Sequence, residues 1–129
     1  MEQKILDFVV AYNAIWNEPD AGRRREAIAQ LWSEEAKHYT DTHELQGHDA
    51  IEARVAEAYH KFVEHGAYAF RLLDNVSSHH NAVRLSWIMV PQKGGEATAA
   101  GTVFVLLGVD GRIICDYQFT DEIQAKERS

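Results

Sequence analysis

Apolar residues recur every three or four positions in the first part of the chain, which is the period of an amphipathic helix. This pattern predicts a first helix over residues 3–17, with Pro19 as its stop, because proline cannot continue the helical hydrogen-bond ladder. A second helix is predicted between an N-terminal cap at Asp20 and the segment Ser33–Glu35. Lys37–Thr42 then reads as a short strand.

A third helix is predicted after a turn at Gly47, and it begins at His48 or Asp49. Gly66 is expected to end this helix as a C-terminal cap in the left-handed conformation. Beyond Gly66 the apolar period changes from 3.6 to 2, which indicates β-strands. The strands predicted there, with a hairpin turn at residues 91–95 and a tight turn at Asp110–Gly111, are Tyr68–Leu72, Val83–Met89, Ala97–Val109 and Arg112–Thr120.

The long predicted strand Ala97–Val109 is apolar on both faces. Val103 and Val105 point to one face, and Phe104 and Leu106 point to the other. One face can pack on the helices, so the other also needs cover, and a second subunit is a natural source of it. The pattern therefore predicts a homodimer formed through the sheet, with burial under the chain's own loops as the alternative.

Length and charge narrow the class of protein. A chain of 129 residues with 46% hydrophobic residues is expected to form one domain over residues 1–129 with one full core. The formal net charge of −7 argues against partners that are nucleic acids or anionic membranes, because both require a basic face.

The cellular setting is predicted from cysteine usage and apolar runs. Cys115 is the single cysteine, so neither an intrachain disulfide nor a cysteine zinc site is expected. No apolar run is long enough to span a bilayer, and the N-terminus lacks the apolar run of a signal peptide. We therefore expect a cytoplasmic protein.

The segment Tyr39–Ile51 is polar, is edged by aromatic residues, and joins the helical part of the chain to the strands. Three helices that lead into a meander of long antiparallel strands indicate an α+β fold in which a curved sheet wraps around a helix. A polar segment at such a junction lies where a cone-shaped fold opens a pocket. The sequence therefore predicts a small-molecule cavity at this segment.

Six short pieces of the chain, in their order and spacing, resemble the nuclear transport factor 2-like superfamily and, within it, the SnoaL-like group. The resemblance covers nearly the whole chain, from Tyr12 to Phe119. It implies a cone-shaped, strongly curved, mostly antiparallel β-sheet wrapped around three helices from the N-terminal half. The superfamily includes isomerases, cyclases, dehydratases, epoxide hydrolases and binding modules, so fold does not settle function. The pieces are Tyr12–Asn17, Leu31–Ala36, Gly47–Ile51, Arg84–Trp87, Gly101–Phe104 and Asp110–Ile113.

The resemblance permits a check against ketosteroid isomerase-like members. These carry a tyrosine in the first helix, a general-base aspartate at the end of the first strand, and a second acid in the penultimate strand. Tyr12 matches the tyrosine, the base position falls on Thr40 with Asp41 one residue later, and the second acid position falls on Val103. Valine cannot donate a hydrogen bond to an oxyanion, so the resemblance argues against ketosteroid-type isomerisation.

The candidate catalytic residues are Asp41, Tyr12 and His43. Asp41 is the candidate general base, because burial beside aromatic residues tunes a carboxylate for proton transfer; the alternative is an exposed loop acid or turn cap. Tyr12 is either a pocket donor or a core tyrosine with a satisfied hydroxyl. His43 or His38 is the candidate acid/base partner of Asp41.

The expected ligand is a small apolar or aromatic organic molecule. Aromatic residues are candidates for the pocket wall, and a place in the core is the alternative for each. Arg84 is a candidate carboxylate or carbonyl binder, or else a solvated strand residue. The candidate ligand-binding residues are Trp16, Trp32, Tyr39, Thr40, Arg84, Trp87, Val103 and Tyr117.

The seven histidines do not predict a metal site. His38, His43 and His48 fall on a strand, a loop and a helix start, and regular spacing across such elements does not make ligands converge. Adjacent His79 and His80 would point to opposite faces of a strand. Phosphate loops and dinucleotide fingerprints are also missing from the sequence, so we expect no cofactor.

Three classes of function remain open. A cofactor-independent lyase, isomerase or cyclase predicts that Asp41 or a nearby histidine lies inside the pocket, within reach of Tyr12 or Tyr39. A non-catalytic binding module for an apolar metabolite predicts apolar walls with Asp41 facing solvent. An interaction module predicts a cavity filled by side chains.

Overall fold

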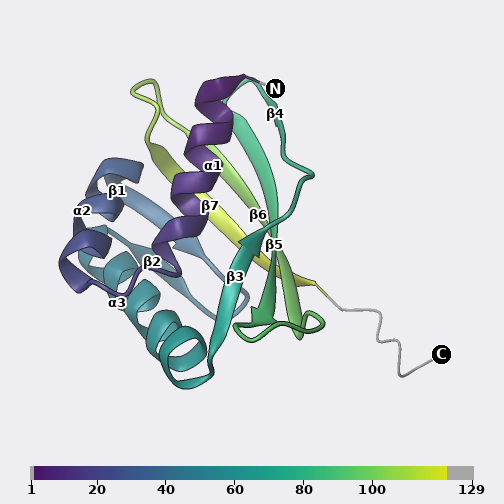
Figure 1. Ribbon diagram of the computed structural model, residues 1–129. Coiled ribbons are helices and arrows are strands. Elements are labelled where there is room, and N and C mark those ends of the chain that lie inside the picture. Colours follow the sequence, from purple (N-terminus) through teal and green to yellow (C-terminus); the bar gives the residue numbers. More distant parts are fainter. Residues whose placement is uncertain (1, 122–129) are drawn as a thin grey trace.

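A curved sheet of seven strands forms the body of the molecule, and its helices lie on one face of it (Figure 1). The computed structural model describes residues 2–121. The elements in chain order are α1 (Gln3–Ile15), α2 (Ala21–Leu31), β1 (Trp32–Tyr39), β2 (Glu44–Gln46), α3 (His48–Ala58), the π-helical turn η1 (Tyr59–His65), β3 (Tyr68–Leu72), β4 (Ser77–His79), β5 (Ala82–Pro91), β6 (Ala99–Leu107) and β7 (Ile113–Asp121).

The sheet is mostly antiparallel. Its strand order is β2-β1-β7-β6-β5-β3, with β4 paired to β5 outside this path. The pairing of β1 with β7 is parallel, which brings the first strand of the chain beside the last. Figure 1 shows α1 crossing one face of the sheet, with α2 and α3 gathered beside its C-terminal end. The predicted α+β fold, a curved sheet wrapped around three helices, is confirmed.

The core lies between the helices and the inner face of the sheet. Alternate residues of β5 and β6 point into it, and Val83, Leu85, Val103 and Val105 have at most 1% of their surface exposed. Helix α1 adds Val9 and two further residues from the same face, which is the face that the apolar period predicted.

The predicted end of the first helix and the predicted start of the first strand differ from the structure. Helix α1 ends at Ile15, two residues earlier than predicted. Strand β1 begins at Trp32 rather than Lys37, and residues 33–35, predicted to end the second helix, lie within it. An irregularity in the pairing with β7 between Trp32 and Lys37 interrupts the alternation of apolar residues, so the sequence pattern hid the start of the strand.

Gly66 does not have the predicted left-handed conformation. Its φ angle is −80°, and the next residue, Ala67, takes the positive φ of 58° instead. Glycine is needed at position 66 for space, because a Cβ there would lie 2.7 Å from the Phe62 carbonyl oxygen. The tight approach follows from the π-helical turn η1, which no sequence pattern indicated.

The strands after Gly66 were predicted to within three residues at each end, because their alternation is regular. The predicted alternation of the long strand is also confirmed, since Val103 and Val105 are buried while Phe104 is 39% exposed. The short strands β2 and β4, with three residues each, were not predicted.

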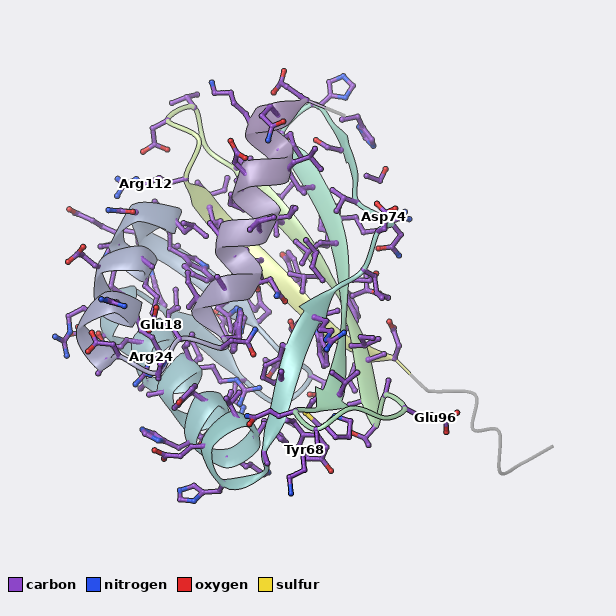
Figure 2. All side chains as sticks on the ribbon, viewed as in Figure 1. Glu18, Arg24, Tyr68, Asp74, Glu96 and Arg112 are labelled. Atoms are coloured by element: carbon purple, nitrogen blue, oxygen red, sulfur yellow. The ribbon has the colours of Figure 1, made fainter. Side chains whose placement is uncertain are left out.

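Arg24 links the turn between α1 and α2 to the η1 segment. Its guanidinium donates to the backbone carbonyl of Glu18 at 2.6 Å and lies 4.9 Å from the ring centre of Tyr59 in η1. Figure 2 labels Arg24 and Glu18 side by side at this corner. Asp20 caps α2 as predicted, because its carboxylate accepts from the Arg23 backbone N–H at 2.8 Å.

The outer face of the sheet carries an aromatic row. Tyr39 of β1 stacks on Tyr117 of β7 with 4.7 Å between ring centres, and Tyr117 also contacts Phe104 of β6. Phe119, further along β7, is 57% exposed. No helix within residues 2–121 is both long enough and apolar enough to cross a bilayer.

Candidate functional site

A cavity of about 230 Å³ opens between α1, the α3–η1 segment and the inner face of the sheet. Its walls are largely aromatic and aliphatic, with a smaller set of polar groups. The loop between β1 and β2 contributes residues 40–43. The other lining residues are Tyr12, Asn13, Trp16, Arg54, Ala58, Phe62, Phe70, Leu85, Trp87, Met89, Ala99, Gln118 and Thr120.

Elementary periodicity explains why these residues meet. Tyr12 and Trp16 are four residues apart, so both project from the same side of the first helix. On β5, Leu85, Trp87 and Met89 alternate with outward residues, and on β7 Gln118 and Thr120 do the same. The cavity is therefore the unfilled end of the same space that the core occupies.

Asn17 fixes the end of α1 against the sheet. Its side-chain amide donates to the Phe70 carbonyl and accepts from the Phe70 N–H, both at 2.8 Å. The Asn17 side chain thus makes the pair of hydrogen bonds that a neighbouring strand would make with Phe70 of β3. This pair of bonds holds Trp16, the preceding residue, at the cavity wall.

Asp116 is the centre of a buried polar network. Tyr12 Oη donates to Asp116 Oδ2 at 2.7 Å, and Trp32 Nε1 donates to Oδ1 at 2.9 Å. His38 Nδ1 lies 2.9 Å from Oδ2. The parallel pairing of β1 with β7 places His38 directly opposite Asp116. All four side chains are at most 2% exposed, so the network is closed to solvent.

The protonation of this network follows from its chemistry. A carboxylate only accepts hydrogen bonds, so His38 carries a proton on Nδ1 whether the ring is neutral or charged. Burial, followed by the charge and hydrogen bond of Asp116, raises the pKa of the Tyr12 phenol well above its ordinary value. Tyr12 is therefore a neutral donor to Asp116.

The second nitrogen of His38 has no partner. His38 Nε2 is buried and makes no hydrogen bond with the described residues. The imidazole packs against Trp16, with 5.9 Å between ring centres, and Trp16 and Tyr12 form the cavity wall in front of it. A buried polar atom without a partner costs about 1–3 kcal/mol, so such an atom beside a cavity marks a candidate functional group.

Several residues predicted from the sequence do meet at the cavity. Asp41 and His43 are on the loop at its mouth, and both are exposed. His43 Nδ1 contacts the Thr42 hydroxyl at 2.9 Å rather than Asp41. The predicted residues that line the cavity are Tyr12, Trp16, Thr40, Asp41, His43 and Trp87.

The other predicted residues lie elsewhere. Trp32 is behind the cavity wall, bonded to Asp116. Tyr39 and Tyr117 stack on each other away from the cavity, and Val103 belongs to the core. Arg84 lines a separate hollow beside Phe104 and β4.

Sequence reasoning missed Asp116, Arg54 and Gln118 as site residues, and it treated His38 only as a partner of Asp41. A signal existed for two of them. Asp116 is a charged residue at an inward position of the last strand. Arg54 lies on α3 among the buried Ile51, Val55 and Ala58. Within residues 2–121, no three His, Cys, Asp or Glu side chains are grouped so as to hold a metal ion.

Comparisons with known proteins place these features in context. The family model for a SnoaL-like domain matches residues 9–115. Comparison with curated protein sequences gives no match. A solved structure of a proposed isomerase of the SnoaL-like family from Agrobacterium tumefaciens is 31% identical, with a TM-score of 0.84, over 94% of this chain and 100% of that one.

Two more distant structures share the fold. A SnoaL-like protein of unknown function from Burkholderia thailandensis is 12% identical, with a TM-score of 0.71, over 95% of this chain and 99% of that one. A proposed polyketide cyclase from Sinorhizobium meliloti is 16% identical, with a TM-score of 0.65, over 87% of this chain and 93% of that one.

Proposed function

The chain belongs to the SnoaL-like family, and we propose that it is a cofactor-independent enzyme that moves a proton within a small organic molecule. The reaction classes are isomerisation, elimination or cyclisation. The similarity to a proposed SnoaL-like isomerase over nearly the whole of both chains supports this proposal. The cavity supplies a site of suitable size for a small substrate.

The observation that carries the proposal is the state of His38. Its Nδ1 is held by Asp116, while its buried Nε2 has no partner. This is the arrangement of a general base whose ring is oriented by a carboxylate. Nε2 is the nitrogen that gains and releases the proton, because Nδ1 keeps its own.

His38 is not among the cavity-lining residues, so in the proposed step the Trp16 ring moves aside and His38 Nε2 takes a proton from a substrate carbon through one water molecule. The electron pair of the broken C–H bond moves toward an electron-withdrawing substrate group. The imidazolium then returns the proton to another substrate atom or, in an elimination, to the departing group. Asp116 acts as a positioning residue that also stabilises the imidazolium, and Tyr12 and Trp32 hold Asp116 in place.

Asp41 on the loop is the alternative general base for the same chemistry. Asp41 and His43 line the cavity mouth, where a bound substrate reaches both. Asp41 is exposed on the loop, whereas His38 is buried and its ring is oriented by Asp116. We therefore expect His38 rather than Asp41 to carry the proton.

Variants at the two positions test this choice. Small molecules that co-purify with the protein are identified by mass spectrometry, and they and their close analogues are incubated with enzyme in D₂O. Deuterium incorporation and product formation are followed by NMR. His38→Asn retains a donor toward Asp116 and removes Nε2, so turnover should fall about 10²-fold or more. Asp41→Asn should retain most of the turnover.

The opposite result decides against this assignment. If Asp41→Asn abolishes turnover and His38→Asn does not, the loop carboxylate is the base. Circular dichroism and thermal unfolding of each variant separate lost chemistry from lost folding.

A non-catalytic binding module is the second candidate. Its supporting observation is that Asp41 faces solvent while the cavity wall is largely aromatic and aliphatic. This function predicts a tightly held ligand that remains chemically unchanged and shows no deuterium exchange. Exchange that depends on His38 would exclude it.

A further inference from the structure

We propose that the cavity binds an organic acid, a small carboxylate with one ring or an apolar body of similar size, and that Arg54 binds its carboxylate. This inference rests on the proposed small-molecule function and specifies the class of ligand. The sequence predicted an apolar or aromatic ligand, and Arg54 was not among its candidate residues.

Arg54 is a cation in the cavity wall, and its side chain is 28% exposed. It lies on α3 between buried residues and lines the cavity. Its Nε is shielded from solvent and makes no hydrogen bond with the described residues. The guanidinium donates from Nη1 to Glu57 Oε1 at 3.2 Å, and the Glu57 side chain is 70% exposed. An exposed ion pair between residues three apart on a helix is weak, so Arg54 has capacity for a stronger partner.

A second donor belongs to the wall of the same cavity. Trp16 Nε1 is also shielded from solvent, lacks a hydrogen bond of ordinary geometry, and belongs to a residue of the wall. Trp16 and Arg54 both act to lower the pKa of the Tyr12 phenol, against the larger effect of burial. Both residues line the same cavity, so the carboxylate of one bound ligand is offered donors from both.

Apart from the exposed Glu57, no carboxylate of residues 2–121 forms a described ion pair with Arg54. Asp116 is saturated by Tyr12, Trp32 and His38. Asp41 lies on the exposed loop at the cavity mouth and forms no ion pair with Arg54 within the part of the chain described. A planar guanidinium fork matches the two oxygens of a carboxylate, which makes a carboxylate the natural missing partner.

The rest of the cavity defines the remainder of the ligand. Phe62, Phe70 and Trp87 form an aromatic wall, with edge contacts of 6.1 Å and 5.4 Å between ring centres. A cavity of about 150 Å³ is enough to bind benzene. The present volume of about 230 Å³ therefore accommodates one ring together with a short acidic arm.

Matched acids and amides test the inference directly. The probes are benzoate, phenylacetate and 3-phenylpropanoate, each compared with its neutral primary amide at pH 7. Binding is measured by calorimetry and by tryptophan emission, because Trp16 and Trp87 line the cavity. We expect at least one acid to bind about 10-fold or more tightly than its amide, as a charge-assisted hydrogen bond implies.

Arg54→Met should bring this ratio to about 1, with Arg54→Gln as a second, polar variant in case the first is unstable. Arg71→Met is the matched control, because it removes the same charge from an exposed position on β3 beside the cavity-lining Phe70. That control should keep the ratio unchanged. Equal binding of acids and amides by the wild type, no binding of either, or a ratio that survives both Arg54 variants would overturn the inference.

The same probes distinguish this inference from the proposed function. His38→Asn should lose proton transfer and retain the preference for the acid. A preserved acid preference in a protein without proton transfer would leave the ligand class standing and reject the enzyme. Proton transfer on a neutral molecule, with no preference for the acid, would support the enzyme and reject the proposed ligand class.

Discussion

At the scale of single residues, Asp116 joins three buried side chains in one polar network. Three side chains direct polar hydrogens at its two oxygens in a space closed to water. Asp116→Ala would leave those three groups buried without an acceptor. We expect a loss of about 3 kcal/mol or more in the free energy of unfolding, measured by urea denaturation.

Asp121→Ala is the control for that prediction. Asp121 is exposed and accepts one hydrogen bond from Thr102 at 2.8 Å, so its removal should change stability by less than about 1 kcal/mol. Similar losses for the two variants would show that the Asp116 network is not a stabilising element.

Tyr12 gives the network a pH dependence. Its pKa is raised in the folded protein, by burial first and by Asp116 second, whereas in the unfolded chain it is near 10. The unfolded state therefore releases this proton first as the pH rises. The stabilisation from Tyr12 is complete below about pH 10 and is lost as the pH rises above it toward the folded pKa.

The measurement for Tyr12 is a comparison of wild type and Tyr12→Phe by urea unfolding between pH 8 and 11. Phenylalanine cannot donate to Asp116, so the variant should be about 1.5–3 kcal/mol less stable at pH 8. The gap should narrow above pH 10, because only the wild type has this proton to lose on unfolding. A gap that stays constant or widens would contradict the assignment.

At the scale of elements, the regular parts of the fold were readable from the sequence and the irregular parts were not. The change of period after Gly66 identified the strands, because a sheet with one buried face enforces alternation. The start of β1 was missed because an irregular pairing with β7 breaks that alternation. The π-helical turn before Gly66 depends on packing around it, and local propensity does not report such packing.

The site residues also divide into some that could be predicted from the sequence and others that could not. The loop at residues 40–43 and two residues of the first helix were recognised, because a polar segment at a helix–strand junction is visible locally. The partnership of His38 with Asp116 joins residues 78 positions apart. It exists because β1 pairs in parallel with the last strand, and that pairing is a property of the sheet rather than of any segment.

The contact between β5 and β6 at the cavity wall gives a prediction for these elements. Gly101 is the direct cross-strand neighbour of Trp87, and a Cβ at position 101 would overlap the indole ring. Gly101→Ala should force Trp87 away from its position and cost about 1–3 kcal/mol, the usual effect of overpacking. Urea unfolding gives the cost, and a change in tryptophan emission reports the movement.

A double-mutant cycle provides the control. Combining Gly101→Ala with Trp87→Leu removes the overlap, so the two changes together should cost less than the sum of their separate effects. Strict additivity would mean that the indole ring does not occupy the space beside Gly101.

At the scale of the whole molecule, the helices cover one face of the sheet and leave the other without helical cover (Figure 1). The uncovered face holds the aromatic row of Tyr39, Tyr117 and Phe104, with Phe119 nearby on the same strand. Contiguous exposed apolar surface of this kind is typical of an interface between subunits. The homodimer predicted from the sequence would bury this row against its copy.

Charge placed in that row tests the homodimer. Phe104→Glu together with Phe119→Glu would put carboxylates on the 39% and 57% exposed positions of the face, and in a two-fold interface each charge is present twice. We expect light scattering to report a dimer of twice the 14.6 kDa chain mass for the wild type and a monomer for this variant. Val10→Glu is the control, because Val10 is 60% exposed on α1, on the other side of the sheet, and its substitution should leave the dimer intact. A wild type that stays monomeric at high concentration would contradict the homodimer, and a dimer that survives the double substitution would place its interface on another surface.

Carboxylate binding by the cavity should be the same in monomer and dimer, because the described lining residues come from one chain and lie on the opposite face of the sheet.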